Sequence, residues 1–103
     1  MYLWLSSFRA MPGKEGEAVE AAKAVAEAMN KGYAPATPCQ VLSERLGDHA
    51  TIYYALGIDS SADIDRAYAW AGEDQEFQAA SRRLNESGLA VPGSRRDTLL
   101  LYR

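Results

Sequence analysis

Thr51–Ile58 is a run of eight residues without proline or charge, and it is the most regular stretch of the sequence. β-Branched and aromatic residues fill it, and apolar side chains occur at both odd and even positions. A strand that is covered on both faces belongs in the middle of a sheet, so we expect this one to be central. The cluster Asp59–Asp63 then predicts a helix start, at which a serine hydroxyl accepts a hydrogen bond from free amides of the first turn.

Three further stretches have a pattern that is typical of strands. In Tyr2–Phe8, Leu3 and Leu5 share one face, and the opposite face carries Tyr2, Trp4, Ser6 and Phe8. Cys39–Leu46 is more polar, which predicts a strand at an edge of the sheet. Thr98–Tyr102 predicts the last strand.

Apolar residues at helical spacing predict a helix from about Glu15 to Lys31, with Gly32 as the left-handed residue that ends it. Many of these apolar residues are alanines, which let a helix lie close to a sheet. A second helical region begins near Ser61 and ends at Gly88. Gly72 predicts a break that divides this region into two pieces.

The predicted order of elements is strand, helix, strand, strand, helix, strand. Two interlocked strand–helix–strand units give an α+β, ferredoxin-like fold, with a four-stranded antiparallel sheet and the helices on one face. We expect Leu3 and Leu5 to fill the space beneath the helices. The opposite face would then expose an aromatic patch, made of Tyr2, Trp4, Phe8 and Tyr53. Monomeric proteins seldom expose such a patch, so we expect a second copy of the sheet to cover it in a homodimer.

With this order of elements, the chain resembles the dimeric alpha–beta barrel superfamily over nearly its whole length. Two segments carry the resemblance: Pro12-Gly13-Lys14, which enters the first helix, and Glu73–Gln78, which is similar to a D-x-E-F segment in the second helical region. The superfamily includes antibiotic-biosynthesis-type monooxygenases, haem-degrading enzymes, lactone isomerases and stress-responsive barrels. The resemblance implies a homodimer whose two sheets enclose a barrel. It also implies a pocket in each subunit, between sheet and helices or inside the barrel.

Composition and charge limit the classes of partner that the protein is expected to have. The chain has 103 residues, 48% of them hydrophobic and 24% charged, which predicts a single folded domain over residues 1–103. A formal net charge of −3 and the lack of a basic run argue against nucleic acid as a partner. The sequence contains neither a membrane-spanning apolar window nor the basic start of a signal peptide. We therefore expect a cytoplasmic protein that does not use a membrane as partner.

One histidine and one cysteine limit the available chemistry. His49 is a candidate general base, but its setting, Gly47-Asp48-His49-Ala50, predicts an exposed hairpin tip. Cys39, at the start of a predicted strand, is typical of a small buried hydrophobe. The sequence contains no zinc motif, no phosphate-binding glycine loop and no carboxylate–histidine cluster. We therefore expect no metal and no cofactor.

Aromatic rings with polar edges are the main candidates for binding a small molecule. With one arginine they form the predicted ligand-binding set, Tyr2, Trp4, Tyr53, Tyr68 and Arg45. Trp4 and Tyr53 are also candidate catalytic residues, together with His49. Arg45 and Arg96 are candidates to pair with a ligand carboxylate, or else with a neighbouring acid such as Glu44 or Asp97.

Two functions are compatible with these residues. The first is a small-molecule-binding barrel, whose enzymatic version is a cofactor-independent oxygenase acting on an aromatic or polyketide-like substrate. The resemblance implies that Trp, Tyr and Asn groups stabilise an enolate-like substrate in such enzymes, whereas Asn30 and Asn85 are predicted at helix ends and outside the pocket. The second is a non-catalytic dimerisation or stress-associated barrel with an aromatic-packed interior. A cavity of ~300 Å³ or more, lined by Trp4, Tyr53 and an arginine, would favour the first function.

Overall fold

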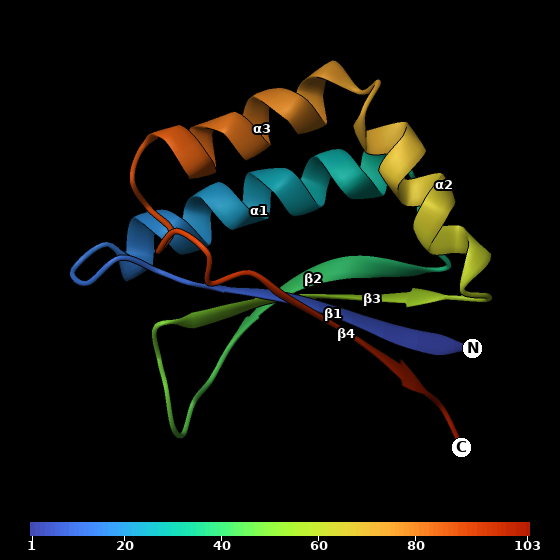
Figure 1. Cartoon of the computed structure of the whole chain (residues 1–103), viewed down its shortest axis with the longest axis horizontal. Helices are drawn as coiled ribbons and strands as arrows, with labels where there is room; N and C mark the ends of the chain where they lie inside the picture. The colour runs from blue at the N-terminus through green and yellow to red at the C-terminus, as the bar shows by residue number, and fades with distance from the viewer.

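Three helices cover one face of a four-stranded antiparallel sheet, and the other face is open (Figure 1). The computed structural model describes residues 1–103. The strands lie in the order β2-β3-β1-β4. The predicted α+β, ferredoxin-like architecture is therefore confirmed. Along the chain, the elements are β1 (Tyr2–Arg9), α1 (Glu15–Gly32), β2 (Thr37–Ser43), β3 (Thr51–Ile58), α2 (Ala62–Ala71), α3 (Gln75–Glu86) and β4 (Arg96–Leu101).

The strands occupy the predicted places in the sheet, but only β3 has the bounds expected from the sequence. β3 is central and β2 lies at an edge, as predicted. β2 ends at Ser43 instead of Leu46. Beyond it, Glu44 Oε2 accepts a hydrogen bond from the Asp48 amide (2.7 Å), and Asp48 Oδ1 accepts one from the Ala50 amide (3.0 Å). These local bonds replace the ladder bonds that a longer hairpin would need. β4 begins earlier than expected because its first residues still pair with β1.

Asn30, near the end of α1, connects this helix to the edge strand β2. Its side chain donates a hydrogen bond to the Cys39 carbonyl (3.0 Å) and accepts one from the Cys39 amide (2.6 Å). The pairing of β2 with β3 is irregular between Thr37 and Gln40. The carboxamide thus satisfies backbone groups at the point where the regular ladder is interrupted.

Gly32 is the last residue of α1 and not the left-handed residue that the sequence predicted. The positive φ, 54°, falls at Ala34 instead. The reason for a glycine at position 32 is close packing, since an added Cβ would lie 2.7 Å from Trp70 Cζ2 and Nε1. The missing side chain therefore lets the Trp70 ring of α2 lie directly against the end of α1.

The predicted break near Gly72 is confirmed, because α2 ends at Ala71 and α3 begins at Gln75. Asp74 caps the new helix: its Oδ1 accepts a hydrogen bond from the Phe77 amide at 2.8 Å. An aspartate at this position satisfies a free amide of the first turn and complements the positive end of the helix. The chain can therefore change direction between α2 and α3 without leaving that helix start uncapped.

At the start of α2, the predicted serine cap is wrong. Ser61 occupies the N-cap position, but no side chain there accepts a hydrogen bond from the helix. Asp63 Oδ2 instead accepts from the backbone amides of Asp59 (3.1 Å) and Ser60 (3.0 Å). The carboxylate fixes the turn that leads from β3 into the helix, and it competes better than a hydroxyl for these donors because it is charged.

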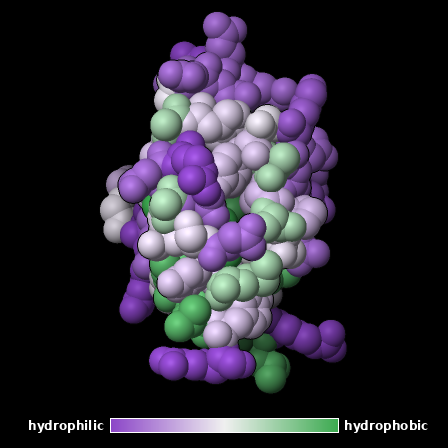
Figure 2. Space-filling view, turned by 90° about the vertical axis from the view of Figure 1, so that its right-hand side faces the viewer, coloured by the Kyte–Doolittle hydropathy of each residue, from purple (hydrophilic) through white to green (hydrophobic).

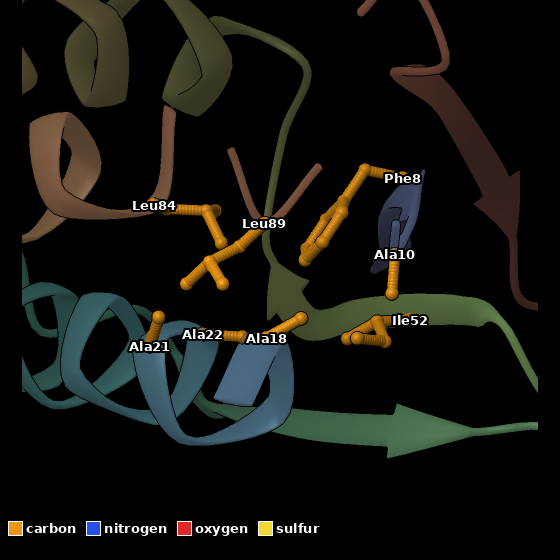
Figure 3. Packing of buried hydrophobic residues seen from close by; sticks show 8 residues of the cluster. All are labelled: Phe8, Ala10, Ala18, Ala21, Ala22, Ile52, Leu84 and Leu89. Atoms are coloured by element: carbon orange, nitrogen blue, oxygen red, sulfur yellow. The ribbon is translucent and has the colours of Figure 1, made fainter. Parts of the chain in front are cut away.

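Two apolar clusters fill the space between helices and sheet. The first, drawn in Figure 3, consists of Phe8, Ala10, Ala18, Ala21, Ala22, Ile52, Leu84 and Leu89. The second consists of Trp4, Ala26, Cys39, Leu56, Ile58 and Ala67. In both clusters, large side chains from the sheet pack against alanines of the helices.

The sequence predicted the two faces of β1 the wrong way round. Trp4 and Phe8, expected on the open face, are each 6% exposed and lie beneath the helices. Tyr2 packs against the second cluster on the same side. Leu3 and Leu5 therefore point to the open face, because side chains alternate along a strand. Both sets are apolar, so alternation identifies which residues share a face but not which face the helices cover.

Gly32→Ala should destabilise the fold because its methyl group would overlap the Trp70 ring. We expect a loss of about 1–3 kcal/mol in the free energy of unfolding, measured by urea titration. Gly16→Ala is the matched control, because a Cβ there meets no atom within 4 Å. This control should be neutral or more stable by up to about 1 kcal/mol. Equal effects of the two variants would contradict the packing role of Gly32.

Candidate functional site

A cavity of about 670 Å³ lies between the sheet and the helices. Strands β1 and β3 form its floor, and α1, α2, α3 and residues 90–95 form its walls. Its hydrophobic lining consists of Trp4, Phe8, Val25, Met29, Tyr54, Leu56, Ala67, Tyr68, Ala71, Phe77, Leu84, Ala90 and Val91. The remaining lining residues are Ser6, Ser7, Gly72, Ser81, Asn85, Pro92, Gly93, Ser94 and Arg95.

The packing of the helices explains why this space is left. Helix α1 packs on β2 and β3, and α3 packs on α1 more than on the sheet. The half of the sheet formed by β1 and β4 is therefore less covered. Leu99 and Leu101 pair with Trp4 and Tyr2 and lie on the helix side, yet they are 37% and 48% exposed. The cavity lies beneath the helices over β1 and β3, and no residue of β4 lines it.

One edge of the cavity carries a chain of polar contacts. The Trp4 indole Nε1 donates a hydrogen bond to Asp97 Oδ1 at 3.3 Å. Asp97 Oδ2 lies 3.5 Å from Arg95 Nε. The Trp4 ring also meets Tyr68 edge-on, with ring centroids 5.9 Å apart. These contacts hold the indole between an apolar wall and a charged mouth.

Tyr54 lines the cavity, and its hydroxyl group has no protein partner. Its oxygen is buried, and no protein group lies within hydrogen-bonding distance. Burial raises the pKa of this phenol above its usual range, and Arg95 acts in the opposite direction. The phenol therefore stays neutral and keeps its proton across the physiological pH range.

The structure brings only part of the predicted ligand-binding set together. Trp4 and Tyr68 line the cavity. Tyr2 lies on the same side of the sheet but belongs to the packing of the second cluster. Tyr53 pairs with Ser7 and Leu42 and points to the open face. The sequence predicted this face for Tyr53. The sheet therefore lies between Tyr53 and the rings of Trp4 and Tyr68.

His49 and Arg45 lie in the exposed loop between β2 and β3, outside the cavity. The expected exposure of His49 is confirmed. Arg45 does not pair with Glu44, whose Oε1 accepts a hydrogen bond from the Tyr53 hydroxyl at 2.6 Å. Asp97, the second expected partner of an arginine, pairs with Arg95 and not with Arg96.

The open face carries a polar cluster of its own. A hollow of about 300 Å³ lies here, and its lining includes Arg9, Tyr53 and Arg96. Arg9 pairs with Asp48, whose pKa is lowered mainly by the hydrogen bond from the Ala50 amide and further by Arg9. The hydrogen bond to Glu44 raises the pKa of Tyr53. Opposite charges are balanced within this cluster, so it is a polar patch on an otherwise apolar face.

Most of the lining residues were not in the set predicted from the sequence, and Phe77, Asn85 and Arg95 are three of them. Asn85 was expected only to mark a helix end, but it shares one face of α3 with Phe77 and so reaches the cavity. Phe77 and Asn85 are about two helical turns apart, and this spacing alone indicates that they lie on one face of the helix. Arg95 had none, because the loop before β4 obtains its position from contacts with distant residues.

The cysteine and the possible metal-binding side chains offer little further chemistry. Cys39 is buried, as predicted, and burial raises the pKa of its thiol to about 11. No three His, Cys, Asp or Glu side chains are grouped so that they could hold a metal ion. The helices of the chain are also too short or too polar to span a bilayer.

Solved structures of several other proteins share the ferredoxin-like α+β fold of this chain. The chain is similar to a NIPSNAP family protein from Agrobacterium tumefaciens, with a TM-score of 0.80 and 18% identity, covering 99% of this chain and 92% of that chain. An uncharacterised NIPSNAP domain protein from Burkholderia xenovorans has a TM-score of 0.76 and 11% identity, with 100% and 95% covered.

A candidate antibiotic biosynthesis monooxygenase from Nitrosomonas europaea is also similar, with a TM-score of 0.70 and 15% identity. This likeness covers 99% of this chain and 98% of that chain. No family model matches the sequence, and no curated protein is significantly similar to it. Because the sequence identities are this low, the similarity to these solved structures shows a shared fold.

Proposed function

We propose that this chain binds an aromatic, largely apolar small molecule in the cavity between the sheet and the helices. The observation that carries the proposal is the cavity itself, with a volume of about 670 Å³ and 13 hydrophobic residues among the 22 that line it. Ligand sites in proteins typically enclose about 300–1,000 Å³, with mostly apolar walls and a few polar groups that orient the ligand.

Aromatic side chains at the cavity support a flat ligand. Trp4, Tyr68 and Phe77 line it, and Phe77 is backed by Trp70 at a centroid distance of 5.0 Å. Rings of this kind offer faces and edges to a bound ring and hold it by offset or edge-on packing. The small residues Ala71 and Ser81 leave room between them.

The alternative of a non-catalytic barrel with a packed interior has less support. Such a barrel needs no ligand site, whereas this chain has a cavity between sheet and helices that exceeds the ~300 Å³ typical of one. Trp4 and an arginine line it as anticipated, although the arginine is Arg95 and Tyr53 lies on the opposite face.

Ala71→Trp should block the cavity, because Ala71 is part of its wall. With N-phenyl-1-naphthylamine as an uncharged fluorescent probe, we expect saturable binding of one probe per chain. The variant should bind at least about tenfold more weakly, since the apolar contacts of the probe are lost. Ala69→Trp, on the exposed side of α2, is the control and should bind like the unmodified chain. Failure of the unmodified chain to bind the probe would refute the proposal.

A cofactor-independent oxygenase reaction is the enzymatic version of this function. It is favoured by the presence of Tyr68 and Asn85 at one cavity, since phenol and amide groups can donate hydrogen bonds to an enolate oxygen. In such a reaction, a ring methylene loses a proton, oxygen adds to the carbanion, and the hydroperoxide loses water. The CH₂ group and O₂ are thereby converted to C=O and H₂O.

Anthrone, a three-ring ketone with an acidic methylene group, tests this reaction. We expect oxygen uptake above the buffer rate, with anthraquinone formed in equal amount. Asn85→Ala should lower the rate by about tenfold or more, because it removes one donor to the enolate oxygen. The free energy of unfolding of this variant serves as its control. Oxygen uptake no faster than in buffer would leave a binding function without oxygenase activity.

We further infer that two chains pair through the open face of the sheet. This face presents Leu3, Leu5, Leu42 and Leu100, and the last two are 47% and 46% exposed. Figure 2 views the end of the molecule with α2 and both termini: hydrophilic side chains cover its helical part, and hydrophobic ones gather towards the sheet. A two-fold pairing would cover these leucines with an identical surface.

Leu100→Lys should weaken such a dimer, because it places a charge on the open face of β4. Native mass spectrometry over a dilution series should show a dissociation constant raised at least about tenfold, as expected for an unpaired charge in an interface. Leu99→Lys is the matched control, because the neighbouring side chain points to the helix side. A monomeric unmodified chain, or equal effects of the two variants, would contradict pairing through this face.

A further inference from the structure

Arg95 is the only charged residue among the 22 that line the cavity. Its side chain is 62% exposed, so the guanidinium lies at the mouth and not on the floor. All other polar lining residues are neutral, namely serines, Asn85 and the phenols of Tyr54 and Tyr68. The cavity is thus apolar inside, and Arg95 stands at its entrance beside the Asp97 carboxylate.

The chain before Arg95 is fixed to the sheet. The Ser94 hydroxyl donates a hydrogen bond to the Val91 carbonyl (2.6 Å) and accepts one from the Arg9 amide (3.0 Å). The Val91 amide in turn donates to the Arg9 carbonyl at 2.8 Å. These bonds place residue 95 next to β1, at the start of β4, so the guanidinium begins from a rigid backbone position.

Asp97 orients the guanidinium without saturating it. The contact joins Arg95 Nε and Asp97 Oδ2 at 3.5 Å, which is long for a charge-assisted hydrogen bond. Arginine carries five N–H donors in a planar fork, and two of them can bind both oxygens of a carboxylate at once. Because Asp97 also accepts from the Trp4 indole, the charged group and the ring wall are positioned by the same carboxylate.

The charge of Arg95 also reaches Tyr54, which is one of the lining residues. It lowers the pKa of the Tyr54 phenol, in opposition to the larger effect of burial. The chain as a whole has a net charge of −3, so a general attraction of anions is not expected. A local cation beside apolar walls therefore favours ligands that carry a negative charge at one end.

We infer that the ligand of this cavity is an aromatic carboxylic acid, whose rings occupy the apolar interior and whose carboxylate binds Arg95 at the mouth. This inference rests on the proposed binding function and adds the chemical class of the ligand. The carboxylate would remain partly in water, where its charge is least costly to keep.

2-Naphthoate and 2-naphthamide test the inference, because they share one ring system and differ in charge. Binding is measured by ligand fluorescence at pH 7 for the unmodified chain and for Arg95→Gln, Arg95→Lys and Arg83→Gln. We expect the unmodified chain to bind the carboxylate about tenfold more tightly than the amide, which corresponds to about 1.4 kcal/mol. Arg95→Gln should abolish this preference by weakening only naphthoate, and Arg95→Lys should restore part of it.

Arg83→Gln removes the same charge from an exposed position of α3 outside the cavity and should keep the preference. Equal affinities of the unmodified chain for the two compounds, or an equal loss in Arg83→Gln, would overturn the inference while leaving the binding function intact. If neither compound binds, the binding function fails, and the inference with it. A preference lost only in Arg95→Gln supports both.

Discussion

The close approach of α1 to the sheet is the constraint on which the rest of the structure depends. The buried side of this helix consists of five alanines and one valine, so little volume separates the helix from the strands. Large side chains must then come from the sheet, and β1 and β3 supply Trp4, Phe8 and Ile52. Helix α3 packs on α1, and the space that the helices leave above β1 and β3 becomes the cavity.

Much of the fold could be predicted because its signals are local. The unbroken strand Thr51–Ile58, the glycine break at Gly72 and the alternation of elements each act within a few residues. The face of β1 could not be predicted, since Trp4 and Leu5 are both apolar and the choice between them depends on the volume that α1 leaves free. Gly32 was misread for a similar reason: a distant ring, Trp70, explains this glycine, and the local backbone does not.

The candidate site was predictable to a smaller extent. Trp4 and Tyr68 were chosen because their rings have polar edges, and both line the cavity. Tyr53 and Arg45 satisfied the same chemical criterion but lie on the other face and in a loop. Composition cannot separate these cases, because ring type says nothing about which side of a sheet a residue faces. Arg95 depends on long-range hydrogen bonds between its loop and β1, which no short pattern encodes.

The two faces of the sheet therefore have different characters. The helix side combines an apolar cavity with one oriented cation, which suits selection of a ligand. The open side combines leucines with a charge-balanced cluster around Asp48, which suits contact with an identical surface. The side chains of β1 alternate between these two faces, so a change of register in β1 would disturb both faces at once.

The Asn30 contact has a consequence for how sheets of different molecules could join. It occupies backbone groups of β2 at an irregular point of the ladder, and such an edge is a poor template for another strand. The opposite edge, β4, pairs with β1 in regular register and contains no proline. The two edges of the sheet are therefore unequal: a side chain covers part of β2, whereas β4 presents the regular backbone of a strand with no neighbour on its outer side.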